Sequence, residues 1–195
     1  MKRMCYRLVA AVAAVQCCVL SWAEEAYDFR KRLEIVHQAD RRDPAAKCAA
    51  DEYEVRDGFR IGIAADAGDF VYRAARDFED YLAVSMKVGA SVVRGAGDLT
   101  LALGGAGGYS VEVGGTGVEV RAADERLLAQ ALYHLEDLMN LREGPFLKKG
   151  VERRRPRFDV RMTHSGYGND IFPDEHLAQM AHYGMTAILV FLDDI

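Results

Sequence analysis

The spacing of apolar and polar residues predicts a layered domain in the middle of the chain. Two segments repeat apolar residues at helical spacing, which predicts helices at 70–82 and 124–139. Short runs rich in β-branched residues predict strands at 60–64, 90–93, 99–103, 109–113 and 118–121. Together these elements predict an α+β domain at residues 58–147, in which a mostly antiparallel sheet carries two helices on one face.

Glycine-rich segments separate several of the predicted strands. Gly114-Gly115-Thr116-Gly117 suits a hairpin turn between the last two strands, because glycine tolerates positive φ. The segment Gly104–Gly108 also admits a phosphate-loop interpretation. However, it joins two strands instead of a strand and a helix, and no Gly-Lys-Ser/Thr follows it, so a hairpin turn is favoured here too.

The carboxyl-terminal region follows the order strand, loop, helix, strand. Residues 157–162 alternate as a strand, and an acidic first turn and a terminal glycine delimit a helix within 173–184. The nearly continuous apolar run 185–192 is typical of a parallel strand buried on both faces. We therefore predict that residues 157–195 form the first βαβ unit of a (β/α)8 barrel. Because a full barrel needs roughly 250 residues, we expect this catalytic domain to be incomplete.

A polar, basic and proline-containing segment, residues 148–156, separates the two patterns. Its composition predicts a solvated linker between the domains. Its positive charge also suits an acidic polysaccharide or a nucleic acid, but a linker is the simpler interpretation.

The amino terminus, residues 1–23, has the organisation of a signal peptide. A basic stretch precedes the apolar run Leu8–Leu20, which is too short to span a bilayer as a helix. Small residues in Ser21-Trp22-Ala23 predict cleavage after Ala23. We expect a secreted or periplasmic protein with no stable membrane insertion after cleavage. A buried helix and a lipid anchor at Cys17 or Cys18 are the weaker interpretations.

Composition adds several expectations for the mature chain. Residues 24–57 are charged and amphipathic, and are predicted to form a leader helix and a linker. Cys48 is the one cysteine that cleavage leaves, so no intramolecular disulfide is predicted. The formal net charge of −5 favours neither nucleic acid nor an anionic membrane as a partner. His176 and His182 fall on different faces of the predicted helix, without a His-Glu-x-x-His motif, so both are predicted to be solvated, and neither a metal site nor a cofactor is expected.

Several of these segments resemble known enzymes. Residues 108–113 followed by 117–124 and the leucine-rich helix resemble the non-catalytic amino-terminal domain that precedes the barrel in family 20 β-N-acetylhexosaminidases and in α-glucuronidases. Residues 155–161 resemble the first barrel strand of family 20 enzymes, and 183–188 resemble the junction between the first helix and the second strand. The resemblance covers about residues 58–195 and implies a bacterial glycoside hydrolase.

The resemblance also implies positions that bind substrate. In family 20 the arginine at the end of the first barrel strand binds hydroxyls of the terminal sugar, and Arg161 matches it. His164 and Tyr167 lie on the following loop, where an aromatic ring can stack on a sugar. Asp193 and Asp194 are similar to an acidic pair that follows the second strand. A salt bridge at the barrel rim for Arg161, and ordinary loop packing for His164 and Tyr167, stay open as alternatives.

The implied activity is O-glycosyl hydrolysis, in which a terminal amino sugar or uronic acid is removed from a glycan substrate. The catalytic aspartate–glutamate pair of family 20 follows the fourth barrel strand, so we expect no catalytic residue in this chain and no activity from it alone. The alternative, from a different class of function, is a non-catalytic carbohydrate-binding or interaction module.

Overall fold

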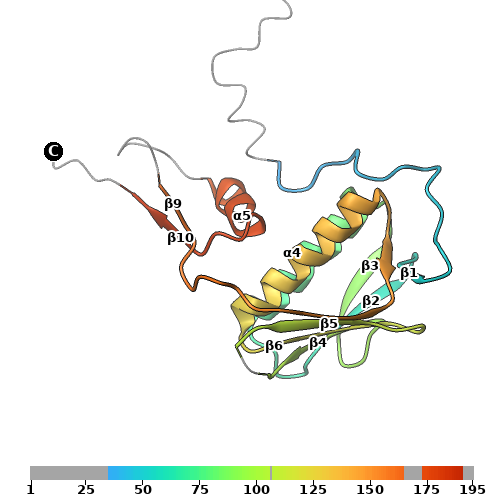
Figure 1. Ribbon diagram of the computed structural model, residues 1–195, viewed down its shortest axis with the longest axis horizontal. Helices are drawn as coiled ribbons and strands as arrows, with labels where there is room; N and C mark the ends of the chain where they lie inside the picture. Colours follow the sequence, from blue (N-terminus) through green and yellow to red (C-terminus); the bar gives the residue numbers. More distant parts are fainter. Residues whose placement is uncertain (1–34, 106, 165–172, 191–195) are drawn as a thin grey trace, which may run out of the picture.

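A computed structural model of the chain describes residues 35–105, 107–164 and 173–190. The predicted signal peptide, residues 1–23, lies outside the described residues. The described part is of mixed α and β type, as predicted, with a larger α+β unit and a smaller βαβ unit (Figure 1). Across these three ranges, no helix combines the length and the apolar character that crossing a bilayer requires.

Both predicted helices of the α+β unit are confirmed, as helix α3 (Asp69–Val84) and helix α4 (Glu125–Arg142). Asp124 caps α4, because its Oδ1 accepts a hydrogen bond from the Leu127 N–H at 2.7 Å. The chain leaves α4 at Glu143, which takes a left-handed backbone conformation with a φ of 55°. Local sequence therefore sets the amino-terminal end of this helix, whereas its carboxyl end places a glutamate in a conformation that favours glycine.

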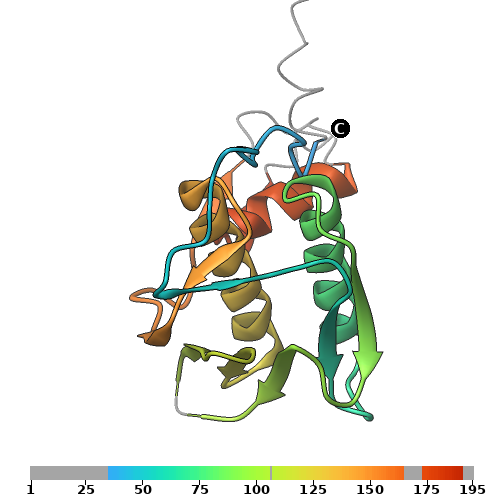
Figure 2. The same ribbon diagram turned by 90° about the vertical axis from the view of Figure 1, so that its right-hand side faces the viewer.

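Six strands form one sheet against these helices. They are β2 (Phe59–Ile63), β3 (Ala90–Arg94), β4 (Leu99–Leu103), β5 (Tyr109–Val113), β6 (Val118–Ala122) and β8 (Gly150–Arg154). Their order across the sheet is β3-β2-β4-β6-β5-β8. Figures 1 and 2 show α3 and α4 side by side on one face of the sheet. The buried core between these layers includes Ile61, Phe78, Leu82, Leu101, Val120, Leu128, Leu132 and Leu135.

The prediction of a mostly antiparallel sheet is wrong, because three of the five strand pairings are parallel. Strand β2 is parallel to β3 and to β4, and β4 is parallel to β6. The chain leaves β2, passes through α3 and returns in β3, and a helical crossover of this kind brings the second strand back parallel to the first. Within this sheet, the antiparallel pairings are those of β5 with β6 and β8.

The two predicted glycine turns have different outcomes. Gly114-Gly115-Thr116-Gly117 joins β5 to β6 as a hairpin, and the Gly114 N–H donates to the Gly117 carbonyl at 2.8 Å. The predicted hairpin turn at Gly104–Gly108 is wrong, because β6 lies between the two strands that this segment joins, β4 and β5. The Gly104 N–H instead donates to the carbonyl of Ala122, at the end of β6, at 2.7 Å.

The connection from β3 to β4 passes β2 at Gly62. Strands β3 and β4 flank β2 on opposite sides, so residues 95–98 must cross it. The Asp98 N–H donates to the Arg60 carbonyl, and the Asp98 Oδ2 accepts from the Arg60 N–H, each at 2.8 Å. A Cβ at Gly62 would lie 2.4 Å from the Gly95 carbonyl oxygen, so a larger residue would force the backbone apart.

Two segments predicted as linkers contribute strands. Strand β8 pairs with β5 at the edge of the sheet, so the prediction of a linker at 148–156 is wrong. Its basic side chains do not prevent pairing, because an edge strand bonds through its backbone while charged side chains face solvent. Strand β1 (Glu52–Glu54) pairs antiparallel with β7 (Phe146–Lys148). From residue 35 to residue 57, the described part of the predicted leader contains β1 and no helix.

The smaller unit comprises β9 (Met162–His164), α5 (Asp174–His182) and β10 (Ala187–Leu189). Strands β9 and β10 pair in parallel, in agreement with the predicted βαβ unit. Helix α5 lies on the side of α3 and α4 that faces away from β4, β5 and β6 (Figures 1 and 2). The predicted burial of the second strand on both faces is wrong for its described residues, since Leu189 is 44% exposed.

Candidate functional site

Arg161 immediately precedes strand β9, so the prediction that it ends the first barrel strand is wrong. Its Nη2 donates to Oε1 of Gln130 on α4 at 3.1 Å, and its backbone N–H donates to Thr186 Oγ1 at 3.0 Å. The first contact joins the βαβ unit to the α+β unit. Barrel enzymes bind substrate at the opposite, carboxyl ends of their strands. A role for Arg161 in sugar binding stays a prediction.

Among the other predicted substrate-binding residues, the structure describes His164. It is the last residue of β9 and pairs in register with Leu189 of β10, so it lies at the carboxyl end of the strand. The structure therefore places Arg161 and His164 at opposite ends of β9 and does not bring them together. Tyr167, Asp193 and Asp194 lie outside the described residues, and their roles stay predictions.

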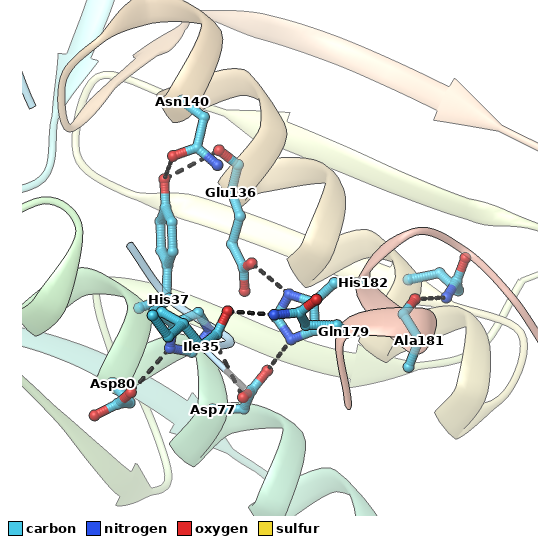
Figure 3. A network of polar contacts seen from close by, with 11 residues as sticks. Ile35, His37, Asp77, Asp80, Glu136, Asn140, Gln179, Ala181 and His182 are labelled. Atoms are coloured by element: carbon cyan, nitrogen blue, oxygen red, sulfur yellow. Dashed lines mark hydrogen bonds and ion pairs between the residues drawn. The ribbon is translucent and has the colours of Figure 1, made fainter. Parts of the chain in front are cut away.

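A cluster of histidines and carboxylates lies where three helices meet the segment before β1 (Figure 3). His182, the last residue of α5, donates from Nδ1 to Glu136 Oε2 and from Nε2 to Asp77 Oδ2, each at 2.8 Å. His37 donates from Nδ1 to Asp80 Oδ2 at 2.8 Å, and its Nε2 lies 3.7 Å from Asp77 Oδ1. Because Glu136 lies on α4 and both aspartates lie on α3, these contacts fasten α5 and the amino-terminal segment to the α+β unit.

Two tyrosines fix the imidazole rings of the cluster. The Tyr133 ring stacks on His182 with a centroid distance of 4.0 Å, and the Tyr81 ring lies edge-on to His37 at 5.6 Å. The Tyr81 hydroxyl lies 3.0 Å from the Glu136 carbonyl oxygen and 3.0 Å from Asn140 Oδ1. The rings are therefore held by packing, and the helix that carries Glu136 is tied to α3.

Burial and pairing shift two pKa values in the cluster. Burial raises the pKa of Glu136 above its usual range, although the hydrogen bond from His182 opposes this effect. Burial alone would lower the pKa of His182, but its hydrogen bonds to Asp77 and Glu136 raise that pKa to about 9. When no other cation is present, His182 therefore carries a proton at neutral pH.

A surface pocket of about 310 Å³ opens beside the cluster. His37, Glu136 and His182 line it, together with Arg41 and Asp137. The cluster is therefore within reach of a small ion from solvent, even though its side chains are largely buried.

Several solved structures are similar to this chain in fold. No protein-family model matches the sequence, and no curated protein matches it significantly. A chitobiase from Flavobacterium johnsoniae has a TM-score of 0.56 at 15% identity, over 82% of this chain and 27% of that one. A GH20 β-N-acetylhexosaminidase from Streptomyces coelicolor A3(2) has a TM-score of 0.54 at 21% identity, over 77% and 34%. A 4-O-methyl-α-glucuronidase of family GH115 has a TM-score of 0.57 at 9% identity, over 70% and 25%. The chain shares its fold with these glycoside hydrolases.

This glycoside-hydrolase fold confirms the resemblance to family 20 and α-glucuronidase enzymes that the sequence indicates. The chain spans between a quarter and about a third of the length of the three solved structures. At these identities the likeness shows a shared fold and does not show what reaction the whole protein catalyses.

Sequence reasoning missed the histidine–carboxylate cluster. The prediction that His182 is solvated is wrong, since its side chain is 14% exposed. One signal was present: Glu136 follows Leu128 and Leu132 at intervals of four, on the apolar stripe of α4. A carboxylate at such a position needs a buried partner. His37 gives no such signal, because it falls in the segment predicted as a leader helix and linker, for which no packing partner was predicted.

Proposed function

We propose that the chain is the amino-terminal portion of a secreted glycoside hydrolase that removes a terminal amino sugar or uronic acid from a glycan. The catalytic carboxylates of this enzyme lie beyond residue 195, so the chain alone has no hydrolytic activity. The fold likeness to a GH20 β-N-acetylhexosaminidase, a chitobiase and a GH115 glucuronidase carries this proposal. The parallel β9–α5–β10 unit supports it, because it is the repeating unit of a (β/α)8 barrel.

The reading frame downstream of codon 195 provides the first test. The protein encoded by the whole frame is assayed with p-nitrophenyl N-acetyl-β-D-glucosaminide and with p-nitrophenyl α-D-glucuronide, and the 195-residue chain serves as the inactive control. Hydrolysis of either substrate by the whole protein supports the proposal. A frame that stops at codon 195, or a whole protein inert toward terminal amino sugars and uronic acids, contradicts it.

Export by a cleaved signal peptide is part of the same proposal. The mature protein is expected to begin at Glu24, because cleavage after Ala23 removes the basic and apolar leader. Amino-terminal sequencing of the protein from the medium or periplasm tests this. A protein that retains Met1 in the cytoplasm would contradict it.

A carbohydrate-binding module is the second candidate function, and a basic pocket in the sheet favours it. The pocket has a volume of about 300 Å³, and its lining includes Arg121, Arg153 and Arg155. The side chains of Arg121 and Arg153 lie on the same face of the sheet, because both residues pair with Ser110. Guanidinium groups bind carboxylates with paired hydrogen bonds. The expected ligand is therefore an acidic glycan.

Calorimetric titration of the chain with oligogalacturonate and with chitin oligosaccharides tests this second candidate. A module of this kind binds the acidic oligosaccharide, and the double variant Arg153→Gln, Arg155→Gln loses at least tenfold in affinity. Arg73→Gln removes an exposed arginine on α3, away from the pocket, and serves as the matched control. Equal affinity of all three proteins would contradict binding at this pocket.

A further inference from the structure

His37, Asp77, Glu136 and His182, here called the four-residue cluster, bring two imidazoles and two carboxylates to one place. Each residue offers one nitrogen or oxygen atom, and these four atoms all lie within 4.8 Å of one another. Figure 3 shows the side chains converging from α3, α4, α5 and the amino-terminal segment. Imidazole nitrogens and carboxylate oxygens are ligands that Zn²⁺ and related transition-metal ions bind in proteins.

Two buried atoms of the cluster lack hydrogen bonds in the described part of the chain. They are Oε1 of Glu136 and Nε2 of His37. The Glu136 and His37 side chains are only 5% and 4% exposed. A buried carboxylate oxygen or ring nitrogen without a partner is unfavourable, and a bound ion is one partner that would satisfy both atoms.

Negative charge exceeds positive charge around the cluster. Asp77, Asp80 and Glu136 contact the two histidines, and Asp137 lines the same pocket as Arg41. Even if both histidines carried protons, four carboxylates would face three cations. A partly buried excess of negative charge favours the binding of a further cation.

We propose that the four-residue cluster is a structural site for a divalent transition-metal ion, with Zn²⁺ as the best fit. Four protein ligands of the types found here, two nitrogens and two oxygens, close a tetrahedral zinc site. Asp80 supports the site as an outer partner, because it accepts the Nδ1 proton of His37 and so leaves Nε2 for the ion. His182 supplies one ring nitrogen to the ion, and its other ring N–H donates a hydrogen bond to a carboxylate.

The geometry requires only a small contraction. Ligand atoms at about 2.0–2.2 Å from zinc lie roughly 3.3–3.6 Å apart in a tetrahedron. Atoms now up to 4.8 Å apart must therefore approach by roughly 1.2–1.5 Å. A shift of the segment that carries His37 is a ready source of this movement, because that segment has no regular secondary structure.

The bound ion would fasten the βαβ unit to the α+β unit. Its ligands come from α5 on one side and from α3, α4 and the amino-terminal segment on the other. The ion takes no part in hydrolysis, so this proposal does not depend on the proposed function.

Metal analysis of the full chain tests the site. All four cysteines are first replaced by serine, so that thiolates do not bind the ion. The protein is stripped with EDTA, dialysed against Zn²⁺ and analysed by mass spectrometry of its metals. We expect about one zinc per chain and a higher melting temperature than for the stripped protein. Co²⁺ in place of zinc should give the visible absorption of a tetrahedral site.

Variants assign the ligands. Glu136→Gln and His37→Gln should each reduce zinc affinity at least a hundredfold, and Asp80→Asn should reduce it about ten- to a hundredfold. His134→Gln is the matched control: it removes a buried histidine of the same helix that binds Glu152 instead of the cluster. Circular dichroism checks that each variant is folded.

Three results would overturn the proposal. One is a folded cysteine-free protein that binds no zinc after dialysis. Another is unchanged zinc affinity in both folded ligand variants. If those variants do not fold, the cobalt complex of the cysteine-free protein provides the third test. An octahedral spectrum with one equivalent of Co²⁺ bound would reject the tetrahedral site.

Discussion

Arg142 and Glu52 join the end of α4 to strand β1 through a two-point ion pair, with Nε 2.6 Å from Oε1 and Nη2 3.2 Å from Oε2. A second Nη2 contact, to the Lys47 carbonyl at 2.8 Å, extends the attachment toward the amino terminus. A bidentate pair of this kind fixes the orientation of both side chains. The segment before β2 is therefore attached to the α+β unit at defined points.

The Glu52–Arg142 pair predicts a pH dependence of stability. Hydrogen bonds from Arg142 hold the pKa of Glu52 below its usual range, although burial opposes this. Because the folded pKa is the lower one, the stabilisation is complete above the unfolded pKa of about 4.3 and disappears as the pH falls through the folded pKa. Glu52→Gln should therefore lower the stability at pH 7 and leave a smaller difference from the wild type at pH 3.

Urea unfolding at several pH values measures this effect. Glu54→Gln is the control, since Glu54 pairs with the exposed Arg56 and such surface pairs contribute little. A constant difference between Glu52→Gln and the wild type from pH 7 to pH 3 would show that the pair does not act through ionisation.

The close approach at Gly62 predicts a large steric effect. Gly62→Ala places a methyl group 2.4 Å from the Gly95 carbonyl oxygen and 2.7 Å from the Gly97 nitrogen. Overpacking against backbone is expected to lower the free energy of unfolding by about 1–3 kcal/mol or more. Gly115→Ala is the matched control, because nothing lies within 4 Å of its added Cβ. Equal urea midpoints for the two variants would mean that residues 95–98 do not cross β2 at Gly62.

The packing of α4 predicts two contrasting leucine variants. Leu132 is completely buried, so Leu132→Ala should lower the free energy of unfolding by about 2–5 kcal/mol. Leu141 lies on the same helix and is 84% exposed, so Leu141→Ala should change the free energy of unfolding by less than about 0.5 kcal/mol. Thermal and urea unfolding measure both. A reversed order would mean that α4 presents a different face to the sheet.

Strand β10 should exchange its amide hydrogens faster than the central sheet. Its described residues pair with one strand, β9, and Leu189 is 44% exposed, whereas Val120 of β6 is fully buried between two neighbouring strands. Hydrogen exchange by mass spectrometry is expected to protect the peptide around Val120 far more than the peptide around Ile188. Comparable protection would indicate that β10 is covered in solution.

Periodicity predicted both helices of the α+β unit and five of the six strands of its main sheet, but not β8. The stripe of Ala75, Phe78 and Leu82 gave α3, and the alternation of Val111 with Val113 and of Val118 with Val120 gave β5 and β6. These patterns report which face of an element is buried, so they locate helices and strands well. They contain no information about which strands become neighbours, and the parallel pairings were missed for that reason.

The candidate site was harder to predict because its residues are far apart in the sequence. Arg161 was assigned from a motif, but its partner Gln130 belongs to another unit of the fold. His37 and His182 meet only after α5 packs against α3 and α4. Local spacing cannot report a contact of this kind, and Glu136 on an apolar stripe was its one local sign.

The pairing of β1 with β7 has a consequence for the order of folding during synthesis. Residues 52–54 leave the ribosome long before residues 146–148, so β1 waits without its partner while the intervening strands and helices form. Closing so long a loop is entropically costly and tends to occur late. Attachment of the amino-terminal segment should therefore be one of the last folding events, which leaves residues 35–57 open to proteases and chaperones in the nascent chain.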